Sequence, residues 1–208
     1  MSMKKSTDNI AFAKEYLSEL TASLEKVDLN AVDEAIELII KAHKKGAKIY
    51  TAGNGGSLAT ASHIVCDFNK GLSAGLEQKF EMICLSDSAS TLTAIANDKE
   101  YDEVFVFPLR GRMKKGDLLI LLSGSGNSEN IVRAAEYAKS IGNKVIAFTG
   151  YSGGRLYNIA DVNIHLPLED MQKAEDAAMI FLHLIARAIA ERYGVDMCGS
   201  YPVVKNDL

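Results

Sequence analysis

The sequence predicts an α/β fold, in which a pair of helices precedes a doubly wound sheet of five parallel strands. From residue 47 onwards, apolar runs of strand length alternate with segments of helix length. The runs at 117–122 and 144–149 are nearly continuous in Leu, Ile, Val and Phe, as in parallel strands that are buried on both faces. Such alternation requires right-handed crossovers, which place helices on both sides of the sheet.

Two helices are expected before the first strand. Apolar residues recur three and four positions apart over 10–27, and Thr7 or Asp8 can cap the start of this helix. A second helix is expected over 30–45, with Asn30 as its cap. The long apolar stripe of the first helix indicates a surface for a partner subunit, and its residues are Ile10, Ala13, Leu17, Leu20 and Leu24.

The strands and helices that follow are expected in regular alternation. The strands are expected at 48–52, 80–85, 117–122, 144–149 and 162–166. The helices are expected at 57–70, 89–96, 127–140, 155–159 and 170–193. We expect one domain over residues 1–208, made of leading helices at 1–46, the α/β core and last helix at 47–193, and an irregular tail at 194–208.

The composition is that of an ordinary globular protein. Of the 208 residues, 48% are hydrophobic and 24% are charged, which excludes wholesale disorder and a disulfide scaffold. A net charge of −4, from 23 basic and 27 acidic residues that are evenly spread, argues against broad binding to nucleic acid or an anionic membrane. No apolar run approaches the ~18 residues that span a bilayer.

The N-terminus and the cysteines indicate a cytoplasmic protein. The first residues, MSMKKSTDN, lack the apolar segment of a signal peptide. Three cysteines cannot all pair with one another, and two of them lie in apolar runs, so we expect reduced thiols in the core. The three cysteines are Cys66, Cys84 and Cys198.

A glycine- and serine-rich loop, SGSGNSEN at 123–130, follows the third expected strand and opens a helix. Its glycines allow the backbone to approach a ligand, and the free N–H groups at the helix start favour an anion such as phosphate. The hydroxyls of Ser123, Ser125 and Ser128 can donate to the same anion. No lysine follows as in a Walker motif, so a nucleoside triphosphate is not expected. The alternative is an ordinary capped turn.

A second loop of this kind, GNGGS at 53–57, follows the first expected strand and also opens a helix. It is not a dinucleotide fingerprint, because Leu58 stands where the third glycine is needed. Asn54 can donate and accept hydrogen bonds, and Ser57 can cap the helix while it contacts a ligand. Ligands of α/β sheets bind at the carboxyl ends of the strands, so we expect both loops to line one crevice.

Two pairs of chemically reactive side chains lie on separate helices. His63 and Asp67 are four residues apart and share a helix face, and Glu175 and His183 are eight apart on the last helix. If the helices face one site, two imidazoles and two carboxylates suit Zn²⁺ or a similar divalent ion. The alternatives are that His183 is an ordinary core residue and that His63 and Asp67 form a solvated pair.

The loop at 53–57 with His63, together with the loop at 123–128, resembles the sugar isomerase (SIS) domain, and within it the phosphoheptose isomerase group. The resemblance covers nearly the whole chain. It implies a phosphate held by serine hydroxyls and a sugar held by neighbouring polar groups. The substrate contacts that it implies are Asn54, Gly55, Gly56, Ser57, Asp98, Ser123, Gly124, Ser125, Ser128 and Gln172.

The same resemblance implies a divalent metal, zinc above all, held by His63, Asp67, Glu175 and His183. Three positions depart from the family pattern. The family has glutamate where this chain has Asp67, which is one methylene shorter. It has glutamine where this chain has Glu175, which adds a negative charge, and it usually has aspartate in place of Gln172.

The activity that the resemblance implies is aldose–ketose isomerisation of sedoheptulose 7-phosphate to a glycero-manno-heptose 7-phosphate through an enediol, a step of lipopolysaccharide heptose biosynthesis. Asp67 or Glu175 would be the base and His183 the acid/base partner. The family also implies a homotetramer with sites between subunits. The alternatives are a non-catalytic SIS scaffold or regulator that binds a sugar phosphate or a protein partner, and an SIS enzyme for another phosphosugar.

Overall fold

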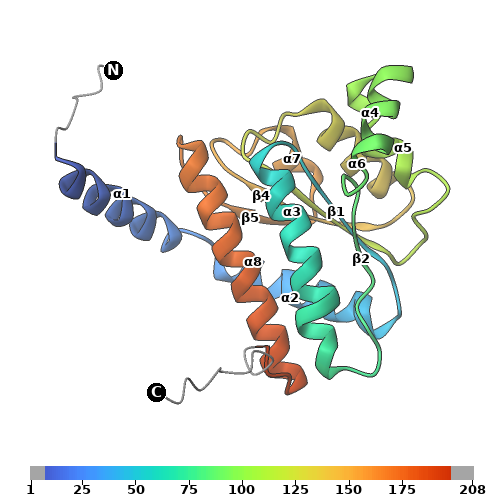
Figure 1. Ribbon diagram of the computed structural model, residues 1–208, viewed down its shortest axis with the longest axis horizontal. Coiled ribbons are helices and arrows are strands. Elements are labelled where there is room, and N and C mark those ends of the chain that lie inside the picture. Colours follow the sequence, from blue (N-terminus) through green and yellow to red (C-terminus); the bar gives the residue numbers. More distant parts are fainter. Residues whose placement is uncertain (1–7, 198–208) are drawn as a thin grey trace, which may run out of the picture.

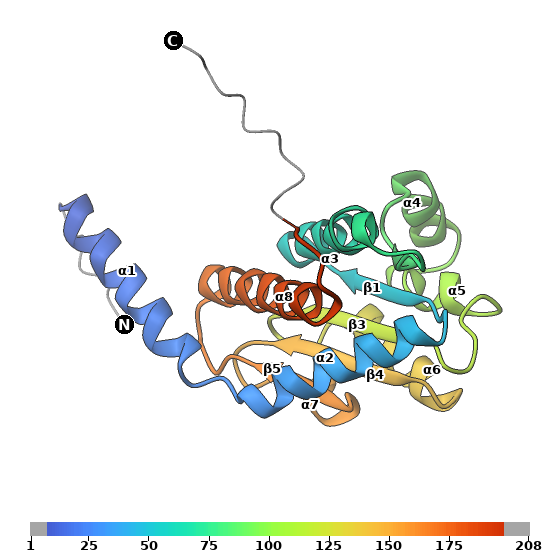
Figure 2. The same cartoon turned by 90° about the horizontal axis from the view of Figure 1, so that it is seen from below.

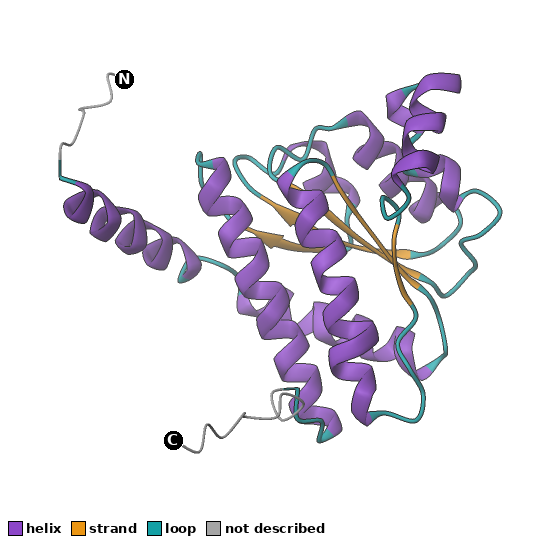
Figure 3. Cartoon of the chain, in the orientation of Figure 1, coloured by secondary structure: helices purple, strands orange, loops and turns teal. Residues whose placement is uncertain are grey.

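A five-stranded, all-parallel sheet forms the centre of the molecule (Figures 1 and 3). The computed structural model describes residues 8–197. The strand order is β2-β1-β3-β4-β5, which confirms the predicted doubly wound sheet. The strands are β1 (Ile49–Gly53), β2 (Met82–Cys84), β3 (Leu118–Ser123), β4 (Lys144–Thr149) and β5 (Val162–His165).

Helices cover both faces of the sheet (Figure 2). One face packs against α2 (Leu29–Lys44), α3 (Gly56–Cys66) and α8 (Met171–Tyr193). The other face packs against α4 (Ala89–Asp98), α5 (Val106–Leu109), α6 (Glu129–Ser140) and α7 (Gly154–Ile159). The sheet therefore separates two hydrophobic cores.

The central strand, β3, contributes to both cores. It is buried along its whole length, which confirms the prediction of a strand that is covered on both faces. Successive side chains of a strand point to opposite faces. Ile120 and Leu122 accordingly enter the core beneath α2, α3 and α8, whereas Leu119 and Leu121 enter the core on the other side.

Several elements differ from their predicted extents. The helix expected at 57–70 is α3 followed by a π-helix, Asp67–Leu72, so the α-helix ends one residue before Asp67. The run expected to be a strand at 80–85 pairs only over β2. The 3-10 helices Ser73–Gly75 and Tyr101–Glu103 and the short helix α5 were not predicted, because segments of three or four residues carry no apolar period.

The caps of α1 (Asn9–Leu24) and of two other helices can be compared with the predicted caps. Asp8 caps α1 by accepting from the N–H groups of Ile10 and Ala11, as predicted. Asn30 was the wrong cap for α2, because Asp28 takes that position and accepts from the Asn30 N–H at 2.9 Å. Ser57 was also wrong as a cap: α3 begins at Gly56, and Gly55 at φ +55° is its N-cap. Thr7 lies outside the described residues.

Two of the three cysteines can be placed. Cys84 is a free thiol in the core, as predicted, and burial raises the pKa of this thiol. Cys66 is also free, but it is exposed, so the prediction of a core thiol was wrong there. Cys66 lies two positions after the buried Ile64, which turns it to the opposite side of the helix. Cys198 and residues 198–208 of the expected tail lie outside the described residues.

Helix α1 projects away from the sheet and its covering helices (Figures 1 and 2). Ile10 and Leu17 of its apolar stripe are exposed, whereas Leu20 is buried. At the start of α8, the Tyr16 hydroxyl donates to Asp176 at 2.6 Å, and this hydrogen bond raises the pKa of Tyr16 to about 12. The helix thus keeps apolar side chains that this chain does not cover.

None of the described helices is long and apolar enough to cross a membrane.

The strand order places the two glycine- and serine-rich loops together. β1 and β3 are neighbours, yet the chain leaves β1 for α3 on one face and leaves β3 for α6 on the other. Gly53 pairs in register with Leu122, so both strands end at the same level of the sheet. The crevice between such diverging connections is where ligands of this type of sheet bind.

The loop after β3 also contacts the loop after β4. A Cβ atom at Gly126 would overlap the carbonyl of Gly153, and Gly126 has a φ of +63°. The Gly126 carbonyl accepts from the N–H of Leu156 at 2.9 Å. Gly126 therefore permits both the backbone turn and the close approach of the two loops.

We predict that Gly126→Ala destabilises the protein by more than about 3 kcal/mol, because positive φ costs about 1–2 kcal/mol and the overlap adds to it. Thermal or urea unfolding measures the change. Gly142→Ala is the matched control, since Gly142 has a φ of +80° but a Cβ atom there would meet nothing within 4 Å. Equal losses in the two variants would show that the loop contact contributes nothing.

Candidate active site

Helices α3 and α8 lie side by side and carry most of the candidate residues (Figure 1). They run in the same direction, because Glu175 lies against Gly56 near their starts and His183 lies against His63 further along. The two helices thus have a common loop end, near the carboxyl ends of β1 and β3, and a common histidine end.

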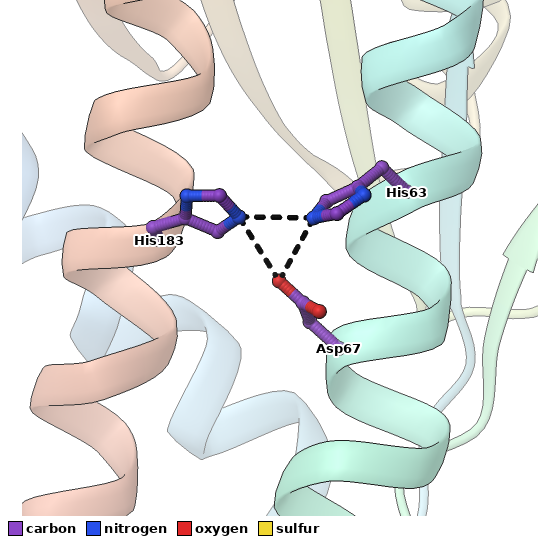
Figure 4. Close-up of side chains that lie close together, drawn as sticks. All are labelled: His63, Asp67 and His183. Atoms are coloured by element: carbon purple, nitrogen blue, oxygen red, sulfur yellow. Dashed lines mark hydrogen bonds and ion pairs between the residues drawn. The ribbon is translucent and has the colours of Figure 1, made fainter. Parts of the chain in front are cut away.

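Three side chains converge at the histidine end (Figure 4). The Nε2 atoms of His63 and His183 are 2.9 Å apart, and each lies 3.4 Å from Oδ2 of Asp67. His63 and Asp67 are one turn apart, at the end of α3 and the start of the π-helix. Both imidazoles are about half exposed, with side-chain exposures of 45% and 48%, so a ligand can reach them. His183 is therefore not the buried core residue that was the alternative.

This triangle fits a divalent metal. Its ligand atoms all lie within 4.8 Å of one another. Among the described residues, it is the cluster of His, Cys, Asp or Glu side chains that is close enough to share a metal ion. Zinc–nitrogen bonds of about 2.0–2.1 Å at tetrahedral angles separate two ligand atoms by about 3.3 Å, close to the distances seen here. Two nitrogens and one oxygen also match the three-ligand sets of catalytic sites, which keep one position open.

Glu175, the fourth predicted ligand, lies apart from this triangle. Its carboxylate meets the backbone at Gly56, where a Cβ atom would overlap it. His183 is eight positions after Glu175, which corresponds to a rise of about 12 Å along α8. The structure thus places Glu175 at the loop end, in a cavity that Ser57, Ser123 and Gly124 also line.

The first turns of α8 pack directly on the loops after three strands. A Cβ atom at Gly124 would lie 2.7 Å from Sδ of Met171, and one at Gly150 would lie 3.1 Å from Cβ of Ala174. Together with the contact at Gly56, these approaches mean that a Cβ atom at any of the three positions would require a neighbour on α8 to shift, most easily at Gly56 and Gly124, where the neighbour is the end of a flexible side chain. The start of α8 therefore closes the loop end of the site.

The serines predicted to hold phosphate lie at this end. Ser57 and Ser123 line one cavity, as does Thr60, which the sequence analysis did not select. The hydroxyl of Ser123 accepts from the Gly126 N–H at 3.2 Å, and that of Ser125 accepts from the Asn127 N–H. Their own protons remain available for an anion. Ser125 and Ser128 are half-buried on the same loop but do not line the cavity.

The remaining predicted contacts are spread around this end. Asn54 is half-buried and hydrogen-bonds to Asn130 and Tyr101, two residues that the sequence analysis did not select. Asp98 is exposed at the end of α4, and Gln172 is exposed in the first turn of α8. Neither lines the serine cavity. Asn130 is the last residue of the SGSGNSEN loop, so the loop motif could have identified it as a site residue. No motif surrounds Tyr101.

Comparisons with known proteins agree with this arrangement. Residues 15–150 match the SIS domain family. A phosphoheptose isomerase from Mycobacterium bovis (strain BCG / Pasteur 1173P2) is 35% identical over 170 residues, which are 79% of this chain and 84% of that protein. One from Aliarcobacter butzleri (strain RM4018) is 34% identical over 181 residues, 86% of this chain and 95% of that protein.

Solved structures of similar proteins have the same fold. A phosphoheptose isomerase from Neisseria gonorrhoeae has a TM-score of 0.81 at 27% identity, covering 88% of this chain and 100% of that one. One from Francisella tularensis has a TM-score of 0.83 at 25% identity, covering 90% and 100%. On the sequence match and the shared architecture, this chain belongs to the SIS-domain phosphoheptose isomerase family.

Proposed function

We propose that this protein isomerises sedoheptulose 7-phosphate to a glycero-manno-heptose 7-phosphate, a step of lipopolysaccharide heptose biosynthesis. The observation that carries the proposal is the pairing, on α3 and α8, of a serine-lined cavity with the triangle of His63, Asp67 and His183. Membership of the phosphoheptose isomerase family supports the choice of substrate. A non-catalytic sugar-phosphate sensor is the second candidate, and turnover by the purified protein separates the two.

The spacing of the two ends suits a seven-carbon substrate. His63 is six positions after Ser57, which corresponds to a rise of about 9 Å along a helix. Six carbon–carbon bonds of an extended chain span roughly 7.5 Å, given single bonds of about 1.5 Å. We therefore place the phosphate near Ser57 and the carbonyl carbons near His63.

The reaction then needs two proton transfers at the histidine end. We assign Asp67 as the base that removes a proton from C1 of the ketose, while His183 gives a proton to the C2 oxygen, and an enediol results. The C1 hydroxyl then loses its proton, C2 gains one, and the aldose forms. Imidazole exchanges protons near neutral pH, which suits the role of His183.

We infer that the metal is zinc and that His63, His183 and Asp67 hold it. A bound divalent ion supplies Lewis acidity that stabilises negative charge on the substrate oxygens. Asp67 and His183 cannot hold the ion and move a proton through the same atom, so Oδ2 of Asp67 and Nε2 of His183 would hold it, which leaves Oδ1 of Asp67 as the base and Nδ1–H of His183 as the proton donor. Glu175, the other candidate base and ligand, forms no hydrogen bond or ion pair with the described residues, and we assign it to the sugar hydroxyls instead.

We further infer a homotetramer with sites at its interfaces. Apolar side chains on two helices support it, since Ile10, Phe12 and Leu17 of α1 and Ile180 and Leu184 of α8 are exposed. Ile180 lies one turn before His183 on the same side of α8, and Leu184 lies one turn after Ile180. A neighbouring subunit on this surface would cover the histidine end and exclude water from it.

Ser57→Ala is predicted to raise KM for the sugar phosphate about tenfold or more, because a hydrogen bond to a charged group contributes about 1.5–3 kcal/mol. The inhibition constant of inorganic phosphate should rise by the same factor. Ser140→Ala, on the exposed end of α6, is the control and should change neither value. A Ser57→Ala enzyme with unchanged phosphate inhibition contradicts the location of the phosphate.

Asp67→Asn and Glu175→Gln distinguish the two carboxylates. Asp67→Asn should lower kcat roughly 10²–10⁴-fold, the usual contribution of a general base. Glu175→Gln should leave kcat within about threefold and lower KM, because a negative charge leaves the phosphate cavity. Zinc content, measured in parallel, reports whether Asp67 is also a ligand. A collapse of kcat in Glu175→Gln alone would reverse the assignment.

Leu17→Glu is predicted to dissociate the tetramer, because it places a charge in an apolar interface. Light scattering after gel filtration should show a fall from about 90 kDa, four times the 22.5 kDa of one chain, to a smaller species. Ala22→Glu adds one negative charge to the exposed opposite side of the same helix and is the matched control. A monomeric wild-type protein would refute the tetramer directly.

A further inference from the structure

A closed pair of amides joins the two loops of the site. Nδ2 of Asn54 donates to Oδ1 of Asn130 at 3.0 Å, and Nδ2 of Asn130 donates back to Oδ1 of Asn54 at 3.0 Å. Asn130 is buried, with 1% of its surface exposed. The hydroxyl of Tyr101 joins this pair by donating to Oδ1 of Asn54 at 2.9 Å.

The directions of these hydrogen bonds follow from one backbone group. The N–H of Ile131 can only donate, and it donates to Oδ1 of Asn130 at 2.9 Å. Nδ2 of Asn130 therefore faces Asn54, and the Asn54 atom that it meets must be Oδ1. That oxygen also meets Tyr101, so the tyrosine proton is committed to it. The phenolic oxygen of Tyr101 is left with acceptor capacity only.

Asn54 has correspondingly little capacity left. Both acceptor positions of its Oδ1 are occupied, by Asn130 and by Tyr101, and one of its two N–H donors is used. It can offer one N–H to a substrate. The sequence predicts that Asn54 can both donate to and accept from a ligand. In the structure, it can only donate a hydrogen bond to the sugar.

The segment that carries Tyr101 is anchored on α6. Arg133 of α6 contacts Glu100, lies 3.5 Å from Oδ2 of Asp102, and hydrogen-bonds to Oε1 of Glu103 at 3.2 Å. These three acidic residues surround Tyr101 in sequence. Tyr101 itself is 53% exposed, so the residue remains accessible. The hydrogen bond to Asn54 holds its hydroxyl in place.

We propose that Tyr101 is a specificity-determining residue, whose phenolic oxygen accepts a hydrogen bond from a hydroxyl group of the bound sugar phosphate. It supplies the acceptor that Asn54 lacks, beside the loop that opens α3. The inference rests on the proposed function, because it adds a contact to the same substrate site.

The test compares Tyr101→Phe with the wild-type enzyme on sedoheptulose 7-phosphate and on its monodeoxy analogues. Tyr101→Phe should raise KM about five- to tenfold, as expected for one neutral hydrogen bond, and leave kcat within about twofold. One analogue, which lacks the hydroxyl that meets Tyr101, should bind both enzymes equally well. If every analogue shows the same Tyr101→Phe effect, or KM does not rise, the proposal is wrong.

Two measurements distinguish a contact between Tyr101 and the sugar from a purely structural role of Tyr101. A further outcome distinguishes failure of this contact from failure of the proposed isomerase activity. The inhibition constant of inorganic phosphate should not change in Tyr101→Phe, and the unfolding temperature should fall by only a few °C, because the variant also loses the hydrogen bond to Asn54. A rise in the phosphate inhibition constant that matches the rise in KM would overturn the proposal. Tyr137→Phe on α6, whose hydroxyl no hydrogen bond in the described residues engages, is the control. If the wild-type protein shows no turnover, the isomerase proposal fails, and the dissociation constants of the same analogues still test Tyr101.

Discussion

The parallel pairing of β1 with β3 is the constraint on which the site depends. The two strands end in register, at Gly53 and Leu122, and their connections diverge to opposite faces of the sheet. This divergence brings the loops at 53–57 and 123–128 to one crevice. The direction of α3 follows from the first loop, so the same pairing also determines where His63 lies.

The second requirement is that α8 packs alongside α3 in the same direction. His183 and His63 are 120 residues apart in the sequence, yet their Nε2 atoms are 2.9 Å apart. Neither helix contains the site alone, because α3 supplies Ser57, His63 and the adjoining Asp67, and α8 supplies Glu175 and His183. The proposed active site thus depends on a contact between an early and a late element of the fold.

Much of the fold could be predicted because buried parallel strands have a distinctive composition, as at 117–122 and 144–149. The loops could be predicted from their glycines, and His63 and His183 were selected through the family resemblance. The position of Glu175 could not, because spacing along α8 says which face a residue occupies but not which loop that face meets. Tyr101 was missed for a different reason: it lies in a three-residue 3-10 helix without periodicity, and its role arises only from contacts with distant residues.

The start of α8 has a consequence beyond the residues that it carries. Met171, Ala174 and Glu175 rest on the backbone of Gly124, Gly150 and Gly56, which belong to the loops after three different strands. The same helix carries His183 about two turns beyond Glu175. Any tilt or slide of α8 would therefore alter the serine cavity and the triangle of His63, Asp67 and His183 together, so under the proposed assignment the affinity for phosphate would change with the affinity for the metal.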